Sequence, residues 1–371
     1  MISITRISED EFSGMRGEWN HLLEKSEANE VFLSWEWMYS WWDVFKRPTR
    51  KLLILLGKNS SGKIIGIAPF YVDIGKGYGL GKKKILRFCS SLETYPDHLD
   101  LIYEKDYGED FLKAIFRYLN ELRNEWEVIK LDGVREDSLV REYFVVSRPG
   151  EHDFIVESVP GSRCPYIRMD QSFKEYLGAF SAKKRQTLLR KRRILIEKEH
   201  AVYKTLDQID EVDHYFRLLW NLHAERSARK GIATTFCGER IYDFHKKFIS
   251  MLLDHKKVVM AFLFIDLLPL VSYYCLRHNK KFYYYQAGIS EEGEKRSAGS
   301  VLLSLLIEQA FQEGCREFDL LRGEEDYKYF WTDTARQNYS ITIRKNNLAG
   351  AVSHKAFVFS QKMRMAKRKW Q

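Results

Sequence analysis

Helical spacing of apolar residues and continuous apolar runs alternate along the first part of the chain. Apolar residues recur at helical spacing over 10–26 and 34–46, and two apolar runs then flank the polar segment KNSSGK at 58–63. Runs on both sides of a glycine-bearing turn predict a β-hairpin. The same criteria predict strands at 85–89, 99–102 and 128–131 and a helix at 110–123. The first part of the chain is therefore expected to form a sheet with helices packed on it.

The second half begins again with helices and continues with strands. Its expected helices cover 172–180, 181–200, 212–230 and 239–255, and its expected strands cover 257–265, 269–277, 281–288, 317–321 and 339–344. Because helices and strands alternate in a similar order in both halves, the predicted fold class is α/β, with a mixed sheet in each of two similar units in tandem.

A strand-rich passage at 153–170, interrupted by Pro160, Gly161 and Pro165, predicts the crossing between the two domains. We therefore expect a first domain at 1–165 and a second at 166–344, with 345–371 available to complete the first.

The composition is that of a globular chain, with 45% hydrophobic residues and 7 prolines among 371. Five scattered cysteines, none at CxxC spacing, favour buried thiols in a reducing compartment over disulfides or a zinc site. The N-terminus lacks the layout of a secretory signal. The apolar run at 258–276 has Asp266 and Pro269 at its centre, which favours two buried strands over a membrane span. These features predict a soluble, cytoplasmic protein.

Positive charge is concentrated in two segments. Residues 353–371 hold six basic side chains and no acidic one, so the rest of the chain carries only +3 of the net +9. This tail suits peripheral contact with an anionic membrane at its inner face, and equally a solvated helix. Seven basic residues also crowd into 183–193 on a predicted helix. That helix suits an anionic acceptor, such as a nucleotide-sugar or a tRNA backbone, and equally a solvated face.

The clearest candidate chemistry lies at 281–331. An aromatic-rich strand leads into a polar loop, and Arg296, Ser297 and Gly299 then open a long helix. The first turn of a helix leaves amide donors free and carries partial positive charge, which suits a phosphate group. Gly299 permits close approach of the anion, and Arg296 offers a charge-assisted contact. An ordinary strand-to-helix turn is the alternative.

The segment from Arg296 to Val301 resembles the pyrophosphate loop of the GNAT acyltransferases, Gln/Arg-x-x-Gly-x-Gly/Ala, from which Val301 departs. The pattern D-x-x-x-G-x-x-x-Y-K-x-x-W at 319–331 resembles the CelD-like branch of that superfamily, and so do residues 32–42 and 180–193. The similarity extends from about residue 30 to 345. It reaches more distantly to the FemAB-type aminoacyl transferases, which contain two GNAT units in tandem.

The resemblance implies two tandem GNAT folds and transfer of an acyl group, in the first instance acetyl, from coenzyme A to an amine or hydroxyl of a small-molecule or nucleotide-sugar acceptor. CelD-like relatives are associated with exopolysaccharide and cell-envelope assembly, so a sugar-bearing acceptor is implied. The implied cofactor-binding residues are Gln286, Arg296, Ser297, Gly299, Ser300 and Lys328. The catalytic candidates are Asp319, Glu325, Tyr327 and His223. No metal-ligand spacing, P-loop or GxSxG elbow occurs, so no metal is expected.

A carboxylate and a phenol beyond a strand end offer a base for an attacking amine and an acid for a departing thiolate. Each candidate also has a structural alternative: helix capping for Glu325, packing for Tyr327 and a half-exposed helix position for His223. The Trp-rich segment 35–42 favours packing over ligand stacking.

Two other functions stay open. One is a Fem-type transferase that moves an aminoacyl group from tRNA to a peptidoglycan precursor, which the basic helix suits. The other is a non-enzymatic scaffold in envelope assembly.

Overall fold

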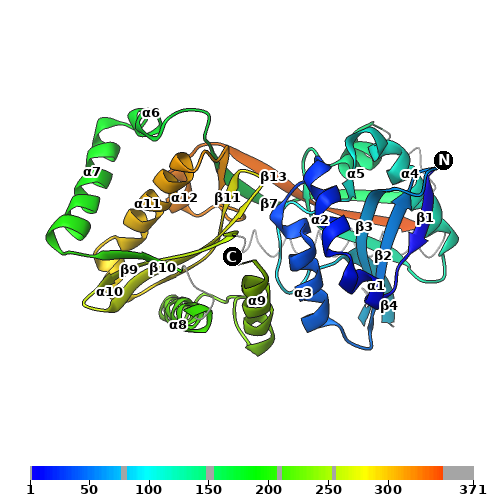
Figure 1. Cartoon of the computed structure of the whole chain (residues 1–371), viewed down its shortest axis with the longest axis horizontal. Coiled ribbons are helices and arrows are strands. Elements are labelled where there is room, and N and C mark those ends of the chain that lie inside the picture. The colour runs from blue at the N-terminus through cyan, green and yellow to red at the C-terminus, as the bar shows by residue number, and fades with distance from the viewer. Residues whose placement is uncertain (1, 77–81, 148–153, 207–210, 253–255, 346–371) are drawn as a thin grey trace, which may run out of the picture. The chain divides into compact units, whose positions relative to one another are not determined.

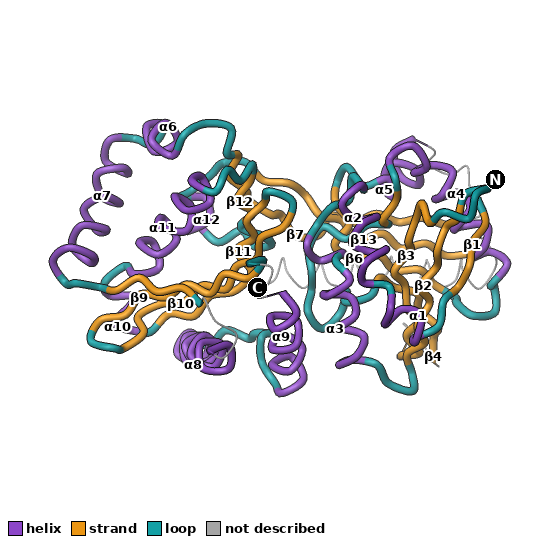
Figure 2. The backbone as a smooth tube through the Cα atoms, viewed as in Figure 1, coloured by secondary structure: helices purple, strands orange, loops and turns teal. Residues whose placement is uncertain are grey.

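The computed structural model describes residues 2–76, 82–147, 154–206, 211–252 and 256–345. The chain divides into two compact units (Figure 1). The first comprises Met1–Ser162 and the segment from Gln337 onwards, and the second comprises Arg163–Arg336. Each unit combines a sheet that contains parallel and antiparallel pairs with helices packed on it (Figure 2). The predicted α/β class, with a mixed sheet in each of two units, is thereby confirmed.

In the first unit, helices α1, α2 and α3 lie along the chain between strands β1 and β2 of its sheet. Its elements in chain order are β1 (Ser3–Arg6), α1 (Glu9–Gly14), α2 (Arg16–Lys25), α3 (Trp35–Phe45), β2 (Arg50–Lys58), β3 (Ile64–Lys76), β4 (Lys82–Phe88), β5 (Ile102–Tyr103), α4 (Gly108–Glu121), β6 (Val128–Arg135) and α5 (Leu139–Arg141). Short 3-10 or π turns lie at Val31–Leu33, Lys105–Tyr107 and Glu142–Ser147. The sheet order is β1-β2-β3-β4-β6-β13, where β13 is Ala335–Lys345, and β5 pairs with β3.

Local sequence signals account for the start of this unit. Ser8 and Glu11 form a capping box that begins α1, and the Asn59 side chain accepts hydrogen bonds from the backbone of Ser61 and Lys63 in the β2–β3 turn. The predicted packing role of the Trp-rich helix is confirmed, because every Trp of α3 is buried. They are Trp35, Trp37, Trp41 and Trp42.

The second unit holds the longer helices. Its elements are β7 (Phe154–Arg168), which begins in the first unit, α6 (Phe173–Gly178), α7 (Ala182–Arg193) with a π turn at Ile194–Lys198, β8 (Val202–Thr205), α8 (Val212–Lys230), α9 (Glu239–Leu252), β9 (Val258–Ile265), β10 (Leu268–His278), β11 (Lys281–Ile289), α10 (Glu291–Lys295), α11 (Ala298–Gln312), β12 (Glu317–Asp319) and α12 (Asp326–Tyr329). The strand order is β7-β12-β11-β10-β9-β8.

The apolar run at 258–276 forms two antiparallel strands, as predicted, with Asp266 and Leu267 at positive φ in the tight turn between β9 and β10. No helix in the described part of the chain is long and apolar enough to span a membrane. Side chains on β10 alternate between two faces: Tyr273 and Cys275 belong to the core formed with α11, whereas the Tyr274 ring contacts Phe216 of α8.

The two sheets differ where a parallel strand joins the antiparallel meander. In the first unit, Leu99 bridges to Val134 of β6 while β5 pairs with β3, so the segment 99–103 occupies the sheet beyond the end of β4. In the second unit, β11 and β12 pair only from Lys281↔Glu317 to Tyr283↔Asp319. From there to Ile289, β11 stays paired with β10 on one side, and among the described residues no strand pairs with its other side. This one-sided end of β11 borders the candidate site.

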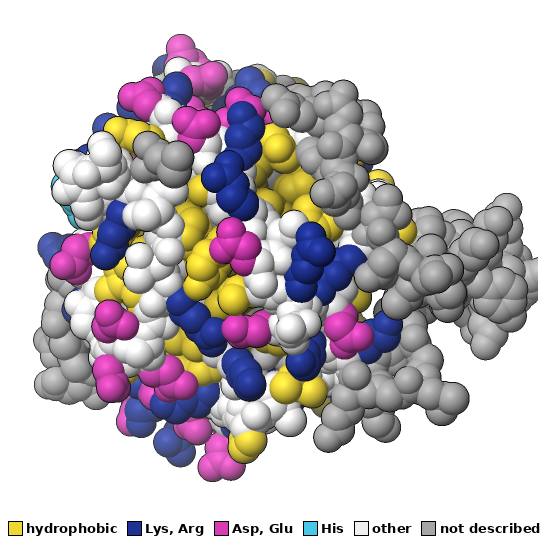
Figure 3. All heavy atoms as spheres, turned by 90° about the vertical axis from the view of Figure 1, so that its right-hand side faces the viewer, with side chains coloured by type: hydrophobic (Ala, Val, Ile, Leu, Met, Phe, Trp, Pro, Cys, Tyr) yellow, Lys and Arg dark blue, Asp and Glu magenta, His cyan; other side chains and the backbone are white. Residues whose placement is uncertain are grey.

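A few elements differ from expectation. Within the passage at 153–170, the described residues Phe154–Arg168 form one long strand, β7, whose extended backbone continues through both prolines and the glycine. The predicted strand at 99–102 is reduced to a bridge at Leu99 and the two residues of β5. The basic tail at 353–371 lies outside the described residues. On the face shown in Figure 3, basic and acidic side chains are interspersed, without a continuous basic patch among the residues drawn in colour.

Candidate active site

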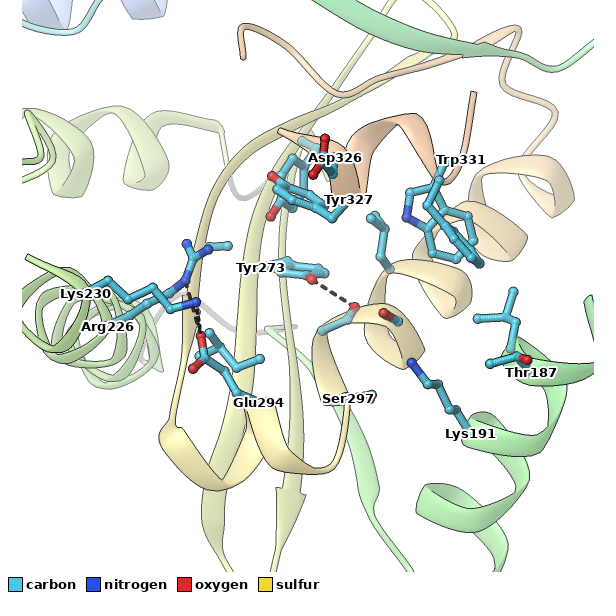
Figure 4. Close-up of a pocket in the computed structure, with 18 residues that line it drawn as sticks. Thr187, Lys191, Arg226, Lys230, Tyr273, Glu294, Ser297, Asp326, Tyr327 and Trp331 are labelled. Atoms are coloured by element: carbon cyan, nitrogen blue, oxygen red, sulfur yellow. Dashed lines mark hydrogen bonds and ion pairs between the residues drawn. The ribbon is translucent and has the colours of Figure 1, made fainter. Parts of the chain in front are cut away.

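A cavity of about 680 Å³ lies within the second unit, beside the first turn of α11 (Figure 4). Helices α7, α8, α10, α11 and α12 and strands β10 and β11 all contribute to its wall. The residues that line it are Thr187, Leu188, Lys191, Arg226, Lys230, Tyr273, Tyr284, Ala287, Ile289, Glu294, Ser297, Gly299, Ser300, Leu303, Asp326, Tyr327, Phe330 and Trp331. The cavity therefore joins the predicted phosphate loop to the region of α12.

The first turn of α11 presents backbone amides without partners. Ser297 is the N-cap residue at φ 57° and makes no side-chain capping hydrogen bond. In the described part of the chain, the amides of Ala298, Gly299 and Ser300 donate no hydrogen bond. The turn also contains no acidic residue, whereas α4, the helix at the matching place in the first unit, begins with Glu109 and Asp110. The start of α11 is thus suited to an anion, and that of α4 is not.

Gly299 brings this turn close to the sheet. The Tyr273 hydroxyl donates a 2.8 Å hydrogen bond to the Gly299 carbonyl, and a Cβ atom at Gly299 would lie 3.0 Å from the same hydroxyl oxygen. A side chain here would push the first turn away from β10. The structure therefore gives this glycine a packing role in addition to the predicted one.

The positive charge beside the turn comes from Lys191. This residue lies on α7, and Figure 4 shows its amine directed toward the start of α11. Among the described residues it has no ion-pair partner. Arg296, by contrast, pairs with Glu292 at 2.6 Å and with Glu199, and it does not line the cavity. The sequence pattern drew attention to Arg296, while Lys191 was noted only as one member of the basic helix.

Three tyrosines line the middle of the cavity. The rings of Tyr273 and Tyr284 meet edge-on at 4.9 Å, and the Tyr327 ring lies 6.4 Å from that of Tyr284. Burial raises the pKa of Tyr273 and of Tyr284 well above the ordinary value for a phenol. Burial of its hydroxyl also raises the pKa of Tyr327, to about 12, although 38% of the side chain is exposed. All three phenols consequently keep their protons near neutral pH.

Only some residues of the motif around Tyr327 line the cavity. Tyr327 lines it, as does the neighbouring carboxylate of Asp326, which the sequence analysis did not single out. Asp319 is fully buried, accepts a hydrogen bond from the Leu321 amide and pairs with Arg336 at 3.5 Å. Glu325 is exposed on the other side of the turn.

Lys328 and Gln286, two proposed cofactor contacts, are used by the fold instead. The Lys328 amine is buried, donates hydrogen bonds to the carbonyls of Leu321 and Arg322, and pairs with Glu325 at 3.1 Å. It thereby fastens the turn between β12 and α12. The Gln286 side chain accepts a hydrogen bond from the amide of the next residue. Neither residue lines the cavity.

His223 lies behind the cavity wall, between α8 and β11. Its Nδ1 is 2.8 Å from the Ala287 carbonyl and its Nε2 is 2.9 Å from the Thr234 hydroxyl. Burial lowers the pKa of this imidazole. Its neighbour Ala287 reaches the cavity, but His223 does not.

A cluster of charges closes the side of the cavity near α8. Glu294 of α10 accepts from Lys230 at 2.7 Å and lies 3.3 Å from Arg229 and 3.8 Å from Arg226 (Figure 4 labels Arg226, Lys230 and Glu294). Burial favours the neutral form of Glu294, but its ion pairs with Lys230 and Arg229 outweigh burial, so its pKa is lowered. Glu294 is therefore an ion-pair centre and a poor base.

Comparison with known proteins shows what this half of the molecule is similar to. Residues 182–329 match the model of the acetyltransferase (GNAT) domain, a range that contains most of the cavity wall. The second unit carries a GNAT fold. No curated protein matches the chain.

Solved structures extend the similarity of fold beyond the GNAT region. FemX matches with a TM-score of 0.60 at 10% identity, over 91% of this chain and 96% of FemX. The C-terminal domain (DUF2156) of a putative lysylphosphatidylglycerol synthetase from Agrobacterium fabrum gives a TM-score of 0.54 at 11% identity, over 95% and 97% of the two chains. L-PGS from Bacillus licheniformis gives 0.54 at 10% identity, over 93% and 95%. At these identities the likeness concerns the fold alone.

Proposed function

We propose that this protein is an acyltransferase that binds acyl-coenzyme A in the cavity of its GNAT unit and passes the acyl group to an amine or hydroxyl. The observation that carries the proposal is the first turn of α11. Its first three amides have no partner in the described part of the chain, Ser297, Gly299 and Ser300 line the cavity, and the Lys191 amine is directed toward the turn. Amides at a helix N-terminus and a lysine together supply the partners that a pyrophosphate needs.

The remainder of the cavity suits the rest of the cofactor. The end of β11 lines it through Tyr284, Ala287 and Ile289, beyond the last residue that pairs with β12. An extended, partly polar chain can lie along the edge of this strand that faces away from β10, because among the described residues no strand covers that edge. A thioester at the far end would then reach Tyr327 and Asp326 on α12.

These two residues can manage the protons of the reaction. The acyl carbon exchanges its bond to sulfur for a bond to the attacking nitrogen or oxygen. The Asp326 carboxylate can accept the proton that the nucleophile loses, and the Tyr327 phenol can donate to the leaving thiolate. Holding both partners in one cavity supplies a further part of the rate, on the order of 7–11 kcal/mol for well-aligned reactants.

The acceptor class follows from the family resemblance of the motif at 319–331. Its likeness to CelD-like proteins supports a sugar-bearing acceptor connected with exopolysaccharide or cell-envelope assembly, and acetyl as the group transferred.

A second candidate function is aminoacyl transfer from tRNA, as in Fem-type enzymes. A specific observation favours it: α7 lines the cavity through Thr187, Leu188 and Lys191 and exposes further basic residues beside it. Those exposed residues are Lys183, Arg190 and Arg193. A basic helix at a cavity mouth suits a nucleic-acid backbone.

Ser300 offers a test of the phosphate assignment. A glutamate at this third helical position stabilises a helix N-terminus, but its carboxylate would occupy the place of the phosphate. We expect Ser300→Glu to fold with unchanged or higher thermal stability and to lose affinity for acetyl-CoA by at least tenfold in isothermal titration. Ser300→Gln is the control of equal size without charge, and it should bind within about threefold of the wild type.

The same titrations separate the two candidate functions. Saturable binding of acetyl-CoA that Ser300→Glu abolishes would support acyl-CoA transfer. Binding of aminoacyl-tRNA with no binding of acetyl-CoA would favour the Fem-type reaction. Wild-type protein that binds neither ligand would contradict both.

A further inference from the structure

A second cavity, of about 440 Å³, lies in the first unit and belongs to no part of the proposed acyl-transfer site. It is formed where the end of α2 meets β5 and the end of β6. The residues that line it are Glu27, Ala28, Glu30, His98, Asp100, Tyr103, Arg135 and Asp137. Four of these eight side chains are acidic and one is an arginine, so the wall carries an excess of negative charge.

Two of the acids are almost completely buried. Glu30 is 1% exposed and pairs with Arg135 at 2.6 Å, and Arg135 also pairs with Asp137 at 2.5 Å. Asp100 is 6% exposed and forms no ion pair among the described residues, although the charge of Arg135 acts on it from a greater distance. Its carboxylate accepts hydrogen bonds from the Leu101 amide and the Ser138 hydroxyl. Burial consequently raises the pKa of Asp100 to about 6.

Tyr103 provides independent evidence that this space receives a ligand. The side chain is 5% exposed, yet in the described part of the chain its hydroxyl makes no hydrogen bond. The charged groups that act on this hydroxyl are Asp100, Glu27, Asp137 and Arg135, all members of the cavity wall. This hydroxyl is not among the fully buried polar atoms without a partner, so it is accessible from the cavity and can donate to or accept from a ligand there.

We propose that this cavity is a binding site for an organic cation, a ligand that carries a primary ammonium group. The ammonium would lie between the Asp100 carboxylate and the Tyr103 hydroxyl. It would donate to both, because an ammonium has three donors and no acceptor. Its positive charge would offset the unpaired charge of Asp100, while Glu30 and Asp137 stay with Arg135. The site concerns ligand binding in the first unit and does not depend on the chemistry of the second.

The geometry favours an organic cation over a metal ion. Among the described residues, which include the whole cavity wall, no three Asp, Glu, His or Cys side chains are grouped closely enough to hold a metal. The volume of the cavity also far exceeds what one ion needs, since a water molecule takes about 30 Å³ in the liquid.

The test is a titration of the full chain with 1,4-diaminobutane, followed by NMR or calorimetry, with 1,4-butanediol as the probe of similar shape without charge. We expect saturable binding of the diamine at one site and no saturable binding of the diol. Asp100→Asn should weaken the diamine at least tenfold, and Tyr103→Phe about threefold or more. Asp110→Asn, an exposed acid outside the cavity, removes the same charge and should leave the affinity unchanged.

Three results would overturn the proposal. They are equal binding of diamine and diol, equal weakening by Asp100→Asn and Asp110→Asn, and saturable binding of Mg²⁺ or Ca²⁺ that excludes the diamine. Circular dichroism on each variant confirms that a lost affinity does not reflect a lost fold. Failure of this test would leave acetyl-CoA binding by the second unit unaffected, so the two proposals fail separately.

Discussion

Replacement of Asp100 by asparagine is expected to stabilise the first unit, by an amount that depends on pH. Burial holds the pKa of Asp100 at about 6, above the ordinary 3.8. The folded protein therefore binds this proton more tightly than the unfolded chain does. Between pH 3.8 and about pH 6, unfolding therefore releases the proton. The contribution of this proton to the free energy of unfolding falls as the pH rises and is gone above about pH 6. An asparagine carries no charge and does not suffer this loss.

The magnitude follows from the same two values. At about 1.4 kcal/mol per pKa unit, the rise from 3.8 to about 6 corresponds to ~3 kcal/mol at pH 7.5. At pH 5 only the interval from 3.8 to 5 contributes, which gives ~2 kcal/mol. The asparagine oxygen can still accept from the Leu101 amide, and its amide can donate to the Ser138 hydroxyl. The hydrogen bonds are thus kept, and the charge is the main change.

Urea unfolding followed by tryptophan fluorescence measures this difference. Seven of the nine tryptophans belong to the first unit, six of them within residues 1–162, so the signal reports mainly on that unit. The free energy of unfolding of the Asp100→Asn protein should exceed that of the wild type by ~2 kcal/mol at pH 5 and ~3 kcal/mol at pH 7.5. Asp110→Asn should differ from wild type by less than about 1 kcal/mol at both pH values, the usual size of a charge effect at a helix start. A less stable Asp100→Asn protein at pH 7.5, or a gain that does not change with pH, would refute the reasoning.

Other substitutions test the second unit. Lys191→Met should weaken acetyl-CoA binding by about tenfold or more, because a charge-assisted contact contributes about 1.5–3 kcal/mol, whereas Arg296→Ala should change the affinity less than about threefold in the same calorimetric assay. A larger effect at Arg296 would indicate that Arg296 contacts the phosphate, as the sequence pattern predicts. Tyr327→Phe should lower kcat by about 100-fold and leave the Kd for acetyl-CoA unchanged. Steady-state kinetics measures kcat and calorimetry measures Kd. Activity equal to that of the wild type would show that Tyr327 is not the acid. Lys328→Met should lower the free energy of unfolding by about 1–3 kcal/mol, because the carbonyls of Leu321 and Arg322 lose their donor. An unchanged urea midpoint would contradict this structural role of Lys328.

Most of the fold could be predicted from the sequence, because its strands are short apolar runs and its helices carry clear start signals. The β9–β10 turn at Asp266 and the capping box at Ser172 are examples. The passage through Pro160, Gly161 and Pro165 could not be predicted, because only the tertiary partners of β7 show that its backbone stays extended. The short pairing of β5 with β3 likewise depends on residues far apart in the chain.

The candidate site was predictable where its residues are consecutive, as in the turn from Ser297 to Ser300. It was not predictable where residues from separate elements converge. Lys191 approaches α11 from a helix about a hundred residues earlier in the chain, and nothing in the basic segment distinguishes it from its neighbours. Arg296 and Lys328 match the family pattern. In the structure, however, Arg296 forms ion pairs with carboxylates, and the Lys328 amine donates hydrogen bonds to backbone carbonyls. Partners of this kind depend on packing and are invisible in a motif.

The segment 99–103, which takes up the sheet position beyond β4, has a consequence for the stoichiometry of the protein. Although the fold occurs twice, within the part of the chain that the structure describes only the second unit leaves a strand edge uncovered beside a helix start without acidic residues. One polypeptide should therefore take up one equivalent of coenzyme A, and saturation curves should show a single class of site without cooperativity within the chain. The first unit, freed from holding that cofactor, is the part in which new binding specificity can arise without disturbing the transfer reaction.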